Sequence, residues 1–277
     1  MCIRDSTRDI TWGIPTPIPG YEEKCIYVWF EAVIGYLSAS IEWAENSGNI
    51  EAWRPFWQDH SSKAYYFLGK DNIPFHTIIW PSMLMGYGDY QGEKGLGKYN
   101  LPYDVPANEF LSLEGRKLST SQNWAVWATD YLDRFDPDPL RYYLSATMPE
   151  TSDSDFSWTG FIRRNNDELV ATYGNLVHRI LTLTHKNFDG KVPNPYELDE
   201  EDKLMLSRAD EALSQVDEAL KLCHFKEALG KGMALAAACN RYVDLKAPWK
   251  AIKEHNSSAA TTLWVSISVL SALKTIQ

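Results

Sequence analysis

The pattern of hydrophobic and polar residues changes near Trp158. Before that residue, short apolar runs precede helix-like stretches, which predicts βα units with strands at residues 24–30 and 64–68. Helices should follow these strands, at 31–45 and from Asp71 onward. Beyond Trp158 apolar residues recur at helical spacing, which predicts four long helices, at 158–186, 200–222, 226–246 and 258–277. The sequence therefore predicts an α/β region followed by an all-α region.

Less regular segments separate these elements. Residues 7–23 are rich in proline and glycine and predict an extended lead-in, and the glycine-rich stretch 86–106 predicts a long loop. Two shorter helices are expected near 123–133 and 139–147. Pro81 is expected to kink the helix that starts at Asp71.

The segment FLGKDNIPFHTIIW, residues 67–80, carries polar residues where a strand meets a helix. In an open α/β sheet, ligands bind at this junction, where helix N–H groups and the helix dipole face a charged substrate. Gly69, Lys70 and Asp71 are therefore candidate ligand-binding residues. The alternative is an ordinary turn with a solvated lysine and aspartate.

A second candidate is the loop EGRKLSTS, residues 114–121, which follows a short apolar run. Arg116 and Lys117 supply positive charge, and Ser119 and Ser121 supply hydroxyl groups, a combination suited to a polyphosphate. The alternative is that one of the serines caps a helix beginning near Gln122 while Lys117 lies in water.

These two segments, together with YVWFEAVIGY (27–36), FDPDPLRYY (135–143) and NRYVDLKAPW (240–249), resemble the methionyl-tRNA synthetase family of class I aminoacyl-tRNA synthetases. The resemblance extends over nearly the whole chain from about Thr7. It implies the end of an inserted connective segment at 1–23 and the second half of a Rossmann-like catalytic domain at 24–113. It further implies a KMSKS-like loop with a stem-contact region at 114–157 and an incomplete helical-bundle anticodon-binding domain at 158–277. Residues 1–6 match no part of the family pattern.

The resemblance also implies an activity. The family joins methionine to ATP, supplied with Mg²⁺, to form methionyl adenylate, and then transfers the methionyl group to methionine tRNA. By position, the methionine pocket would contain Trp29, Ala32, Tyr36, Phe75, His76 and Trp80. Gly69 and Asp71 would hold the ATP ribose with Lys70 nearby, and Lys117 would contact the pyrophosphate, assisted by Arg116, Ser119 and Ser121. The sequence departs from the family at Thr120, which replaces the usual second lysine of the loop, at Val33, which replaces proline, and at Glu31, which replaces aspartate.

A predicted helical face carries the candidate tRNA contacts. Leu169, Val170, Tyr173, Leu176, Val177, Ile180 and Leu181 form one apolar stripe. Asn175 and Arg179 lie together on another face and, with Trp249, match family positions that read the anticodon. An exposed indole can stack on a base, and Asn and Arg can bond base edges. The alternatives are a solvated polar face and a core tryptophan.

Two family signatures are absent from the sequence. None of the six histidines has a second histidine three places away, so the His-x-Gly-His motif of the ATP site is missing. Cys2, Cys25, Cys223 and Cys239 form no Cys-x-x-Cys pair, and we expect no zinc site. We therefore expect a fragment that is inactive alone. Scattered cysteines are also typical of a reducing cytoplasm.

Composition narrows the choice of partners. The 277 residues are 44% hydrophobic and 13% aromatic, which is enough for two hydrophobic cores. The sequence has no apolar run long enough to predict a membrane span, so we expect no membrane among the partners. The net charge of -10 argues against indiscriminate nucleic-acid binding, so tRNA contacts should be confined to patches. Two other functions stay open: a class I synthetase for another aliphatic amino acid, and a noncatalytic tRNA-binding module. Nothing in the sequence predicts an oligomeric state.

Overall fold

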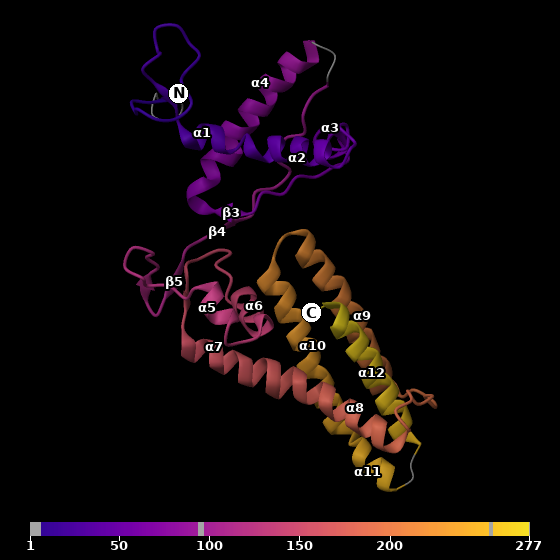
Figure 1. The fold of residues 1–277 in the computed structure, drawn as a ribbon. Helices are drawn as coiled ribbons and strands as arrows, with labels where there is room; N and C mark the ends of the chain where they lie inside the picture. Colours follow the sequence, from indigo (N-terminus) through magenta and orange to yellow (C-terminus); the bar gives the residue numbers. More distant parts are fainter. Residues whose placement is uncertain (1–6, 94–96, 255–256, 277) are drawn as a thin grey trace. The chain divides into compact units, whose positions relative to one another are not determined.

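The computed structural model describes residues 7–93, 97–254 and 257–276. The chain divides into two compact units, one ending at Glu109 and the other beginning at Phe110, and each is described by itself (Figure 1). Residues 1–6, for which we expected no match to the family pattern, lie outside the described residues. The fold is mixed α/β with a large helical share, as the sequence predicts.

The first unit contains short strands and helices. Its elements are β1 Thr7–Arg8, β2 Cys25–Ile26, α1 Val28–Ala32, α2 Gly35–Asn46, α3 Arg54–Gln58, β3 Leu68–Gly69, the 3₁₀-helix η2 Lys70–Asn72, the π-helix η3 Phe75–Ile79, α4 Trp80–Glu93 and β4 Ala107–Asn108. Strands β1 and β2 pair antiparallel, and β3 and β4 pair parallel.

The parallel pair confirms the extended segment that was expected at residues 64–68. Leu68 lies opposite Ala107, and Gly69 lies opposite Asn108. The pairing continues upstream, where the Tyr66 N–H donates to the Asp104 carbonyl over 3.0 Å. Because the strands are parallel, their carboxyl ends meet, and the residues after Gly69 and Asn108 become neighbours.

Two predictions for this unit are wrong in part. The strand expected at 24–30 covers only Cys25–Ile26, and the apolar residues from Val28 begin α1. A short apolar run fits a buried strand and a buried helix turn equally well, so periodicity alone does not separate them. The loop expected at 86–106 is also helical at first, because α4 continues through its glycines to Glu93.

The core of the first unit is rich in aromatic side chains. Its buried members come from α2, α3, α4 and the segments that lead into them: Val33, Leu37, Ala44, Trp53, Trp57, Tyr66, Trp80 and Leu84. Trp57 and Trp80 meet edge to face, with ring centroids 6.0 Å apart. This core fixes the start of α4, where several predicted site residues lie.

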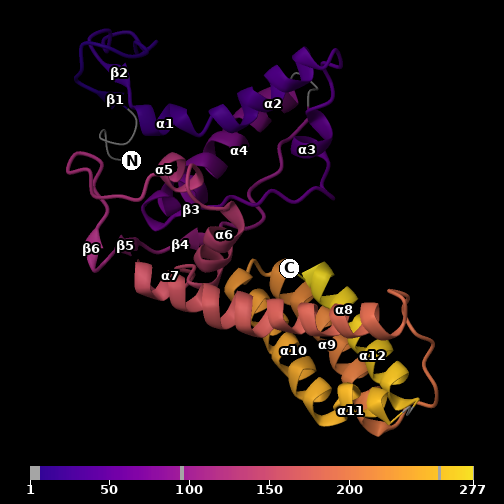
Figure 2. The same cartoon turned by 60° about the horizontal axis from the view of Figure 1, so that its bottom comes forward.

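The second unit joins a small sheet to a helical bundle (Figure 2). Its elements are β5 Leu111–Leu113, β6 Arg116–Lys117, α5 Ala128–Leu132, α6 Pro137–Ala146, β7 Ser154–Phe156, α7 Trp158–Arg164, the π-helix η4 Asn165–Gly174, α8 Asn175–Asn187, α9 Glu200–Lys221, α10 Phe225–Lys246, α11 Pro248–Lys253 and α12 Ser258–Ile276. The sheet order is β6-β5-β7, with β6 antiparallel and β7 parallel to β5.

The four long helices are confirmed. The first, expected at 158–186, is a continuous rod in which η4 lies between α7 and α8. Leu176 and Ile180 from the predicted stripe are fully buried, but Val170 and Leu181 are more than half exposed. The π-helix explains Val170, because its wider turns rotate the residues before Asn175 out of a 3.6-residue phase.

The shorter predicted helices have mixed outcomes. The one near 139–147 is confirmed as α6, whereas the one near 123–133 forms only at Ala128–Leu132. Residues 119–124 instead make a tight turn. No helix therefore begins at Gln122.

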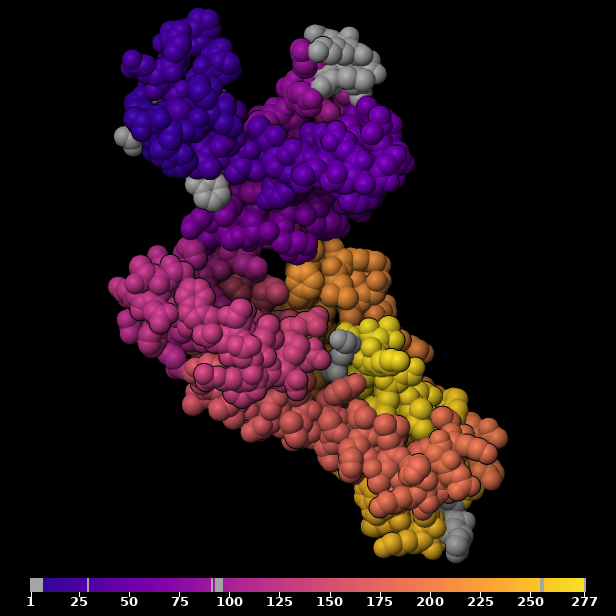
Figure 3. Space-filling model, viewed as in Figure 1, coloured from indigo at the N-terminus to yellow at the C-terminus, as the bar shows by residue number. Residues whose placement is uncertain are grey.

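Helix α12 packs against α8, α9, α10 and α11. It is long and apolar enough to cross a membrane, but 56% of its most apolar 18-residue stretch is buried in the bundle. Part of it reaches the surface of the second unit in Figure 3. This degree of burial is typical of a core helix in a bundle.

Candidate functional site

An aromatic and histidine cluster forms in the first unit from four successive segments. Tyr36 lies in the first turn of α2, Tyr66 precedes β3, His76 lies in η3, and Trp80 begins α4. The ring of Tyr36 is 5.2 Å from that of Tyr66, 5.6 Å from that of His76 and 6.4 Å from that of Trp80. Three of the six residues expected at the methionine pocket, Tyr36, His76 and Trp80, therefore lie together.

Hydrogen bonds fix the orientation of these rings. His76 Nδ1 lies 2.9 Å from the Asn72 carbonyl oxygen, which can only accept, so Nδ1 carries the proton. In the neutral imidazole, His76 Nε2 then accepts from the Tyr36 hydroxyl at 2.9 Å. The Trp80 indole N–H donates to the Tyr66 hydroxyl, also at 2.9 Å, and burial raises the pKa of Tyr66. The cluster is therefore neutral at Tyr66 and held in one tautomer at His76.

The cluster offers one open face. His76 and Trp80 are 6% and 2% exposed, whereas Tyr36 is 45% exposed. A ligand would therefore meet the Tyr36 ring and hydroxyl first, with the imidazole behind it. Such a surface suits an apolar, polarisable side chain with one hydrogen-bonding group nearby.

The other three expected pocket residues are placed less closely. Ala32 is exposed at the end of α1, which packs against η3. Phe75, in η3, is half-buried against the aromatic core. Trp29 belongs to α1, but its side chain is not described by the structure. Sequence reasoning missed Tyr66, although its place two residues before Leu68 puts both on one face of an extended strand.

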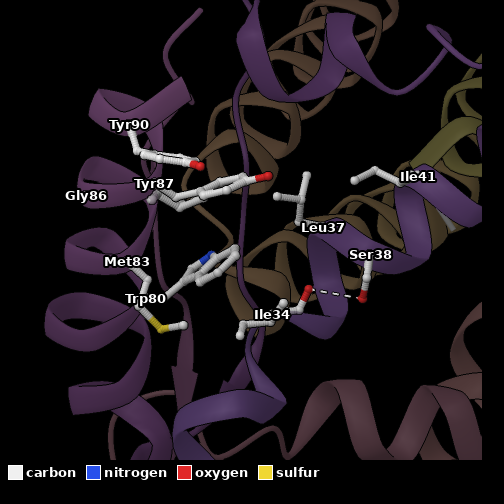
Figure 4. Close-up of a pocket in the computed structure, with 10 residues that line it drawn as sticks. Ile34, Leu37, Ser38, Ile41, Trp80, Met83, Gly86, Tyr87 and Tyr90 are labelled. Atoms are coloured by element: carbon white, nitrogen blue, oxygen red, sulfur yellow. Dashed lines mark hydrogen bonds between the residues drawn. The ribbon is translucent and has the colours of Figure 1, made fainter. Parts of the chain in front are cut away.

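Two cavities border the cluster. The first, of about 530 Å³, runs between α2 and α4 and includes Trp80 alone among the expected pocket residues (Figure 4). Figure 4 shows the rings of Tyr87 and Tyr90 side by side on α4, facing Leu37 on α2. The second, of about 500 Å³, is lined by Tyr36 together with Tyr66 and Lys63 among others. Tyr36 therefore borders one cavity and Trp80 the other.

The strand-to-helix junction presents Gly69, Lys70 and Asp71 in order. Gly69 ends β3, and a side chain added there would meet nothing within 4 Å, so the backbone is open to a ligand. Lys70 forms an ion pair with Glu109, the residue that follows β4. Asp71 is exposed in η2. Sequence reasoning missed Glu109, which becomes a neighbour only through the parallel register of β3 and β4.

The cationic loop is a β-hairpin. Strands β5 and β6 are joined by Glu114 and Gly115, whose φ angles of 49° and 73° are both positive, as a type I′ turn requires. The Gly115 N–H donates to the Asp155 carboxylate over 2.8 Å. Lys117 is exposed and has no ion pair within the described residues.

The hairpin continues into a closed turn. Ser119 and Trp124 exchange two backbone hydrogen bonds, of 3.0 and 2.8 Å. The Ser119 hydroxyl accepts from the Gln122 N–H at 3.3 Å and lies 3.3 Å from the Ser121 hydroxyl. The helix cap considered for these serines is therefore wrong, because Ser119 closes a turn within the loop. The Arg116 guanidinium lies over the Trp124 ring, 4.2 Å from its centroid.

The candidate anticodon residues lie in the bundle of the second unit. Asn175 begins α8 and is exposed, and Arg179 follows one turn later. The Arg179 guanidinium lies 5.3 Å from the centroid of the Trp249 ring and bonds Asp244 Oδ1 at 2.6 Å. Trp249 is half-buried and packs against the bundle core. Arg179 and Trp249 are thus in contact, and Asp244 is a partner that sequence reasoning missed.

A buried network supports the turn that carries Trp249. Asp202, only 3% exposed, accepts from the Tyr242 hydroxyl at 2.7 Å and pairs with Lys246 at 2.8 Å. Asp199 and Asp202 form a capping box at the start of α9, and Asp199 also binds Lys246. Helix α10 then ends at Lys246, and its C-cap residue Ala247 has a left-handed φ of 42°. The network therefore ties the end of α10 to the start of α9.

Within the described residues, no group of three or more His, Cys, Asp or Glu side chains is arranged to hold a metal ion. Cys25 and Cys239 are buried free thiols. That the chain has no zinc site stays a prediction.

Comparison with known proteins gives consistent matches. The family model for class I tRNA synthetases (M) matches residues 2–181. A methionine–tRNA ligase of Thermomicrobium roseum is 54% identical over 271 residues, which are 98% of this chain and 45% of that protein. A second, from Dehalococcoides mccartyi, is 55% identical over 98% of this chain and 47% of that protein.

A solved structure agrees. The Mycobacterium tuberculosis methionyl-tRNA synthetase in complex with methionyl-adenylate matches with a TM-score of 0.80 at 27% identity, covering 98% of this chain and 50% of that one. The chain spans about half the length of the curated relatives it matches. The resemblance read from the sequence motifs is thereby confirmed, and the chain belongs to the class I tRNA synthetases (M).

Proposed function

We propose that the chain is part of a methionine–tRNA ligase, which activates methionine with ATP and transfers it to methionine tRNA. The single observation that carries the proposal is the Tyr36–His76 hydrogen bond, backed by Trp80, at the ligand-binding end of a parallel strand pair. The relatives named methionine–tRNA ligase and the neighbour bound to methionyl-adenylate support the same assignment.

The cluster suits methionine for a chemical reason. The methionine side chain is flexible and its thioether is polarisable, so it gains from contact with aromatic rings. A hydroxyl beside those rings helps to reject a plain hydrocarbon, since the hydroxyl would lose its partners without a replacement. We assign Trp29, Ala32, Tyr36, Phe75, His76 and Trp80 to this pocket.

ATP, with Mg²⁺ as part of the substrate, would bind at two places on the chain. Gly69 and Asp71 would contact the ribose, and the open backbone at Gly69 supports this. Lys117 would contact the pyrophosphate, with Ser119 and Ser121 as hydroxyl donors. No covalent enzyme intermediate is needed, so these groups would act by positioning and by stabilising charge.

The tRNA would be read on the bundle. In this proposal the first unit is the second half of a Rossmann-like catalytic domain, and the bundle is an anticodon-binding domain. Trp249 would stack on a base, with Asn175 and Arg179 bonding base edges. Asp244 Oδ1 already accepts one hydrogen bond from the Arg179 guanidinium, so a base would use the remaining N–H donors or compete with that carboxylate.

The test is amino-acid-dependent ATP–pyrophosphate exchange. It requires an enzyme in which this chain is completed with the remaining residues of the T. roseum relative, and each aliphatic amino acid is tried in turn. Exchange with methionine alone supports the proposal. Exchange driven better by leucine, valine or isoleucine would indicate a synthetase for another amino acid.

A further arm separates the noncatalytic alternative. If the completed enzyme binds methionine tRNA but shows no exchange with any amino acid, the chain is a tRNA-binding module. The intact T. roseum enzyme is the positive control for both arms.

A further inference from the structure

We propose that Trp124 anchors the Lys117 loop and that Arg116 is a positioning residue that acts through Trp124. In this view Arg116 does not contact the phosphates of ATP. The inference rests on the proposed function, because it concerns how the loop presents Lys117 to ATP.

Trp124 is bonded to the loop in three ways. Its backbone pairs with Ser119 through two hydrogen bonds. Its indole N–H donates to the Leu113 carbonyl at 3.1 Å, which ties the end of the loop back to β5. Its ring lies beneath the Arg116 guanidinium, at 4.2 Å. The side chain also packs against the buried cluster of Leu113, Tyr143 and Phe156, so its own position is fixed.

Strand geometry separates the two cations of the loop. Arg116 and Lys117 are consecutive residues of β6, and consecutive side chains of a strand point to opposite faces. Arg116 is on the face that carries Trp124, so Lys117 is on the other. A phosphate group that contacts Lys117 therefore lies on the opposite face of β6 from Arg116. Arg116 could reach it only if β6 or the Arg116–Trp124 stack were broken.

The stack has a consequence for Lys117. Residues 119–124 form a turn in which Asn123 has a left-handed φ of 50°, a conformation that asparagine tolerates. The Arg116 stack and the Leu113 bond hold Trp124, and Trp124 holds Ser119. Residues 116–119 are thereby confined, which reduces the conformations that Lys117 must lose when it meets ATP.

The kinetic test is a double-mutant cycle in the completed enzyme. Arg116→Ala, Trp124→Leu and the double variant are compared by methionine-dependent ATP–pyrophosphate exchange. If Arg116 acts through Trp124, each single change lowers kcat about two- to fivefold, the factor that an exposed cation–π contact is worth, and the double variant is no slower than the worse single one. Multiplying losses, or a rise in KM for ATP with Arg116→Ala alone, would overturn the proposal.

Two further variants control for charge and for ring shape. Arg208→Ala removes an exposed guanidinium from α9 and should leave exchange unchanged. Trp124→Phe keeps a ring for Arg116 to cover and should recover most of the kcat lost in Trp124→Leu. A Trp124→Phe variant as slow as Trp124→Leu would contradict a role for the stack.

A second readout uses the chain as it stands and needs no catalysis. Amide hydrogen exchange at Ser119 and Trp124 should become several-fold faster in Arg116→Ala, while the Gly115 amide, bonded to Asp155, should not change. Unchanged exchange at Ser119 and Trp124 would refute the anchor. A completed enzyme that makes no methionyl adenylate would instead refute the proposed function, and the exchange experiment would still decide the anchor.

Discussion

At the scale of single residues, the two lysines expected near ATP differ in their surroundings. Lys70 is paired with Glu109, and both side chains are about one-third exposed. Lys117 is exposed on a hairpin and has no ion pair among the described residues. A lysine that has no carboxylate partner can bind a developing negative charge without first breaking an ion pair. We therefore expect Lys117 to respond more strongly than Lys70 to the charge that develops as pyrophosphate leaves.

The first prediction concerns Lys117→Ala in the completed enzyme. Adenylate formation should slow on the order of 10²-fold, whereas the Kd for methionine should stay the same, because the lysine acts on charge found mainly in the transition state. Single-turnover kinetics and equilibrium binding measure the two quantities. Lys203→Ala, an exposed lysine on α9, is the control. Equal losses of rate and methionine affinity would rule out a transition-state role.

The second prediction concerns Tyr36→Phe in the chain alone. The change removes the hydroxyl that donates to His76 Nε2, and the buried ring nitrogen is left without that donor. The free energy of unfolding should fall by about 1 to 3 kcal/mol, measured by urea denaturation. Tyr21→Phe, whose ring is half exposed, should change it by less than about 0.5 kcal/mol. If the two variants are equally stable, the Tyr36–His76 bond contributes little.

At the scale of elements, the junction of α9 and α10 concentrates buried charge. The third prediction is that Asp202→Ala lowers the free energy of unfolding by about 3 to 5 kcal/mol, because Lys246 and Tyr242 lose a buried partner. Asp210→Ala, at an exposed position on the same helix, should have little effect. A similar small effect of both substitutions would mean that water replaces the Asp202 carboxylate.

The fourth prediction is a pH dependence at the same junction. The hydrogen bond from Lys246 holds the pKa of Asp199 below its usual 3.8, so its contribution is complete above that value and is lost as the pH falls through the lower folded-state pKa. Burial opposes the charge of Lys246, but bonds to Asp199 and Asp202 outweigh it and raise its pKa above 10.5. That contribution is complete below pH 10.5 and is lost as the pH rises further.

The measurement for this window is urea unfolding of the native chain and of Lys246→Met from about pH 3 to pH 11. The stability difference between the two should be greatest between these limits and should shrink at both ends. A difference that stays constant at all pH values would show that Lys246 stabilises α10 by packing alone.

Elements with a strong repeat could be predicted from the sequence, and elements defined by neighbours could not. Helix α9 begins after an Asp199 capping box and follows the expected range within one residue. The strand expected at 24–30 forms only at Cys25–Ile26, because a short apolar run such as residues 25–30 fits a strand and a helical turn equally well. The helical turn through Gly86 was missed because Trp80 and Leu84 hold α4 in the buried core, which overrides the low helix propensity of glycine.

The candidate site divides in the same way. Motifs marked Tyr36, His76 and Trp80, which lie together, but not Tyr66, which bonds Trp80 from the segment before β3. Glu109 and Asp244 were also missed, because each meets its cation across a long stretch of sequence. Partners of this kind depend on strand register and helix packing, which local patterns do not encode.

At the scale of the whole molecule, the net charge of -10 leaves little general attraction for RNA. Under the proposed function, tRNA would bind through local groups, and the contact of Arg179 with Trp249 is one place where a cation and a ring meet on the bundle. Trp249 also packs against the core, so it serves two roles in this proposal. The effect of a Trp249 substitution on tRNA recognition can be separated from its effect on stability only by comparison with a second tryptophan that packs against the same core.

The fifth prediction makes that comparison with Trp249→Ala and Trp264→Ala in the completed enzyme. Both rings pack, half-buried, against the same bundle core, but only Trp249 touches Arg179. Trp249→Ala should weaken charging of methionine tRNA by the cost of a lost stack, on the order of 1 to 3 kcal/mol, and leave adenylate formation intact. Trp264→Ala should lower the Tm, since loss of a core tryptophan costs roughly 3 to 5 kcal/mol, but below that Tm it should charge tRNA normally. For each variant, tRNA charging is measured at the same low temperature, and thermal unfolding is measured over the same heating range. If Trp249→Ala behaves as Trp264→Ala does, melting early yet charging normally in the cold, then Trp249 belongs to the core and the anticodon assignment is wrong.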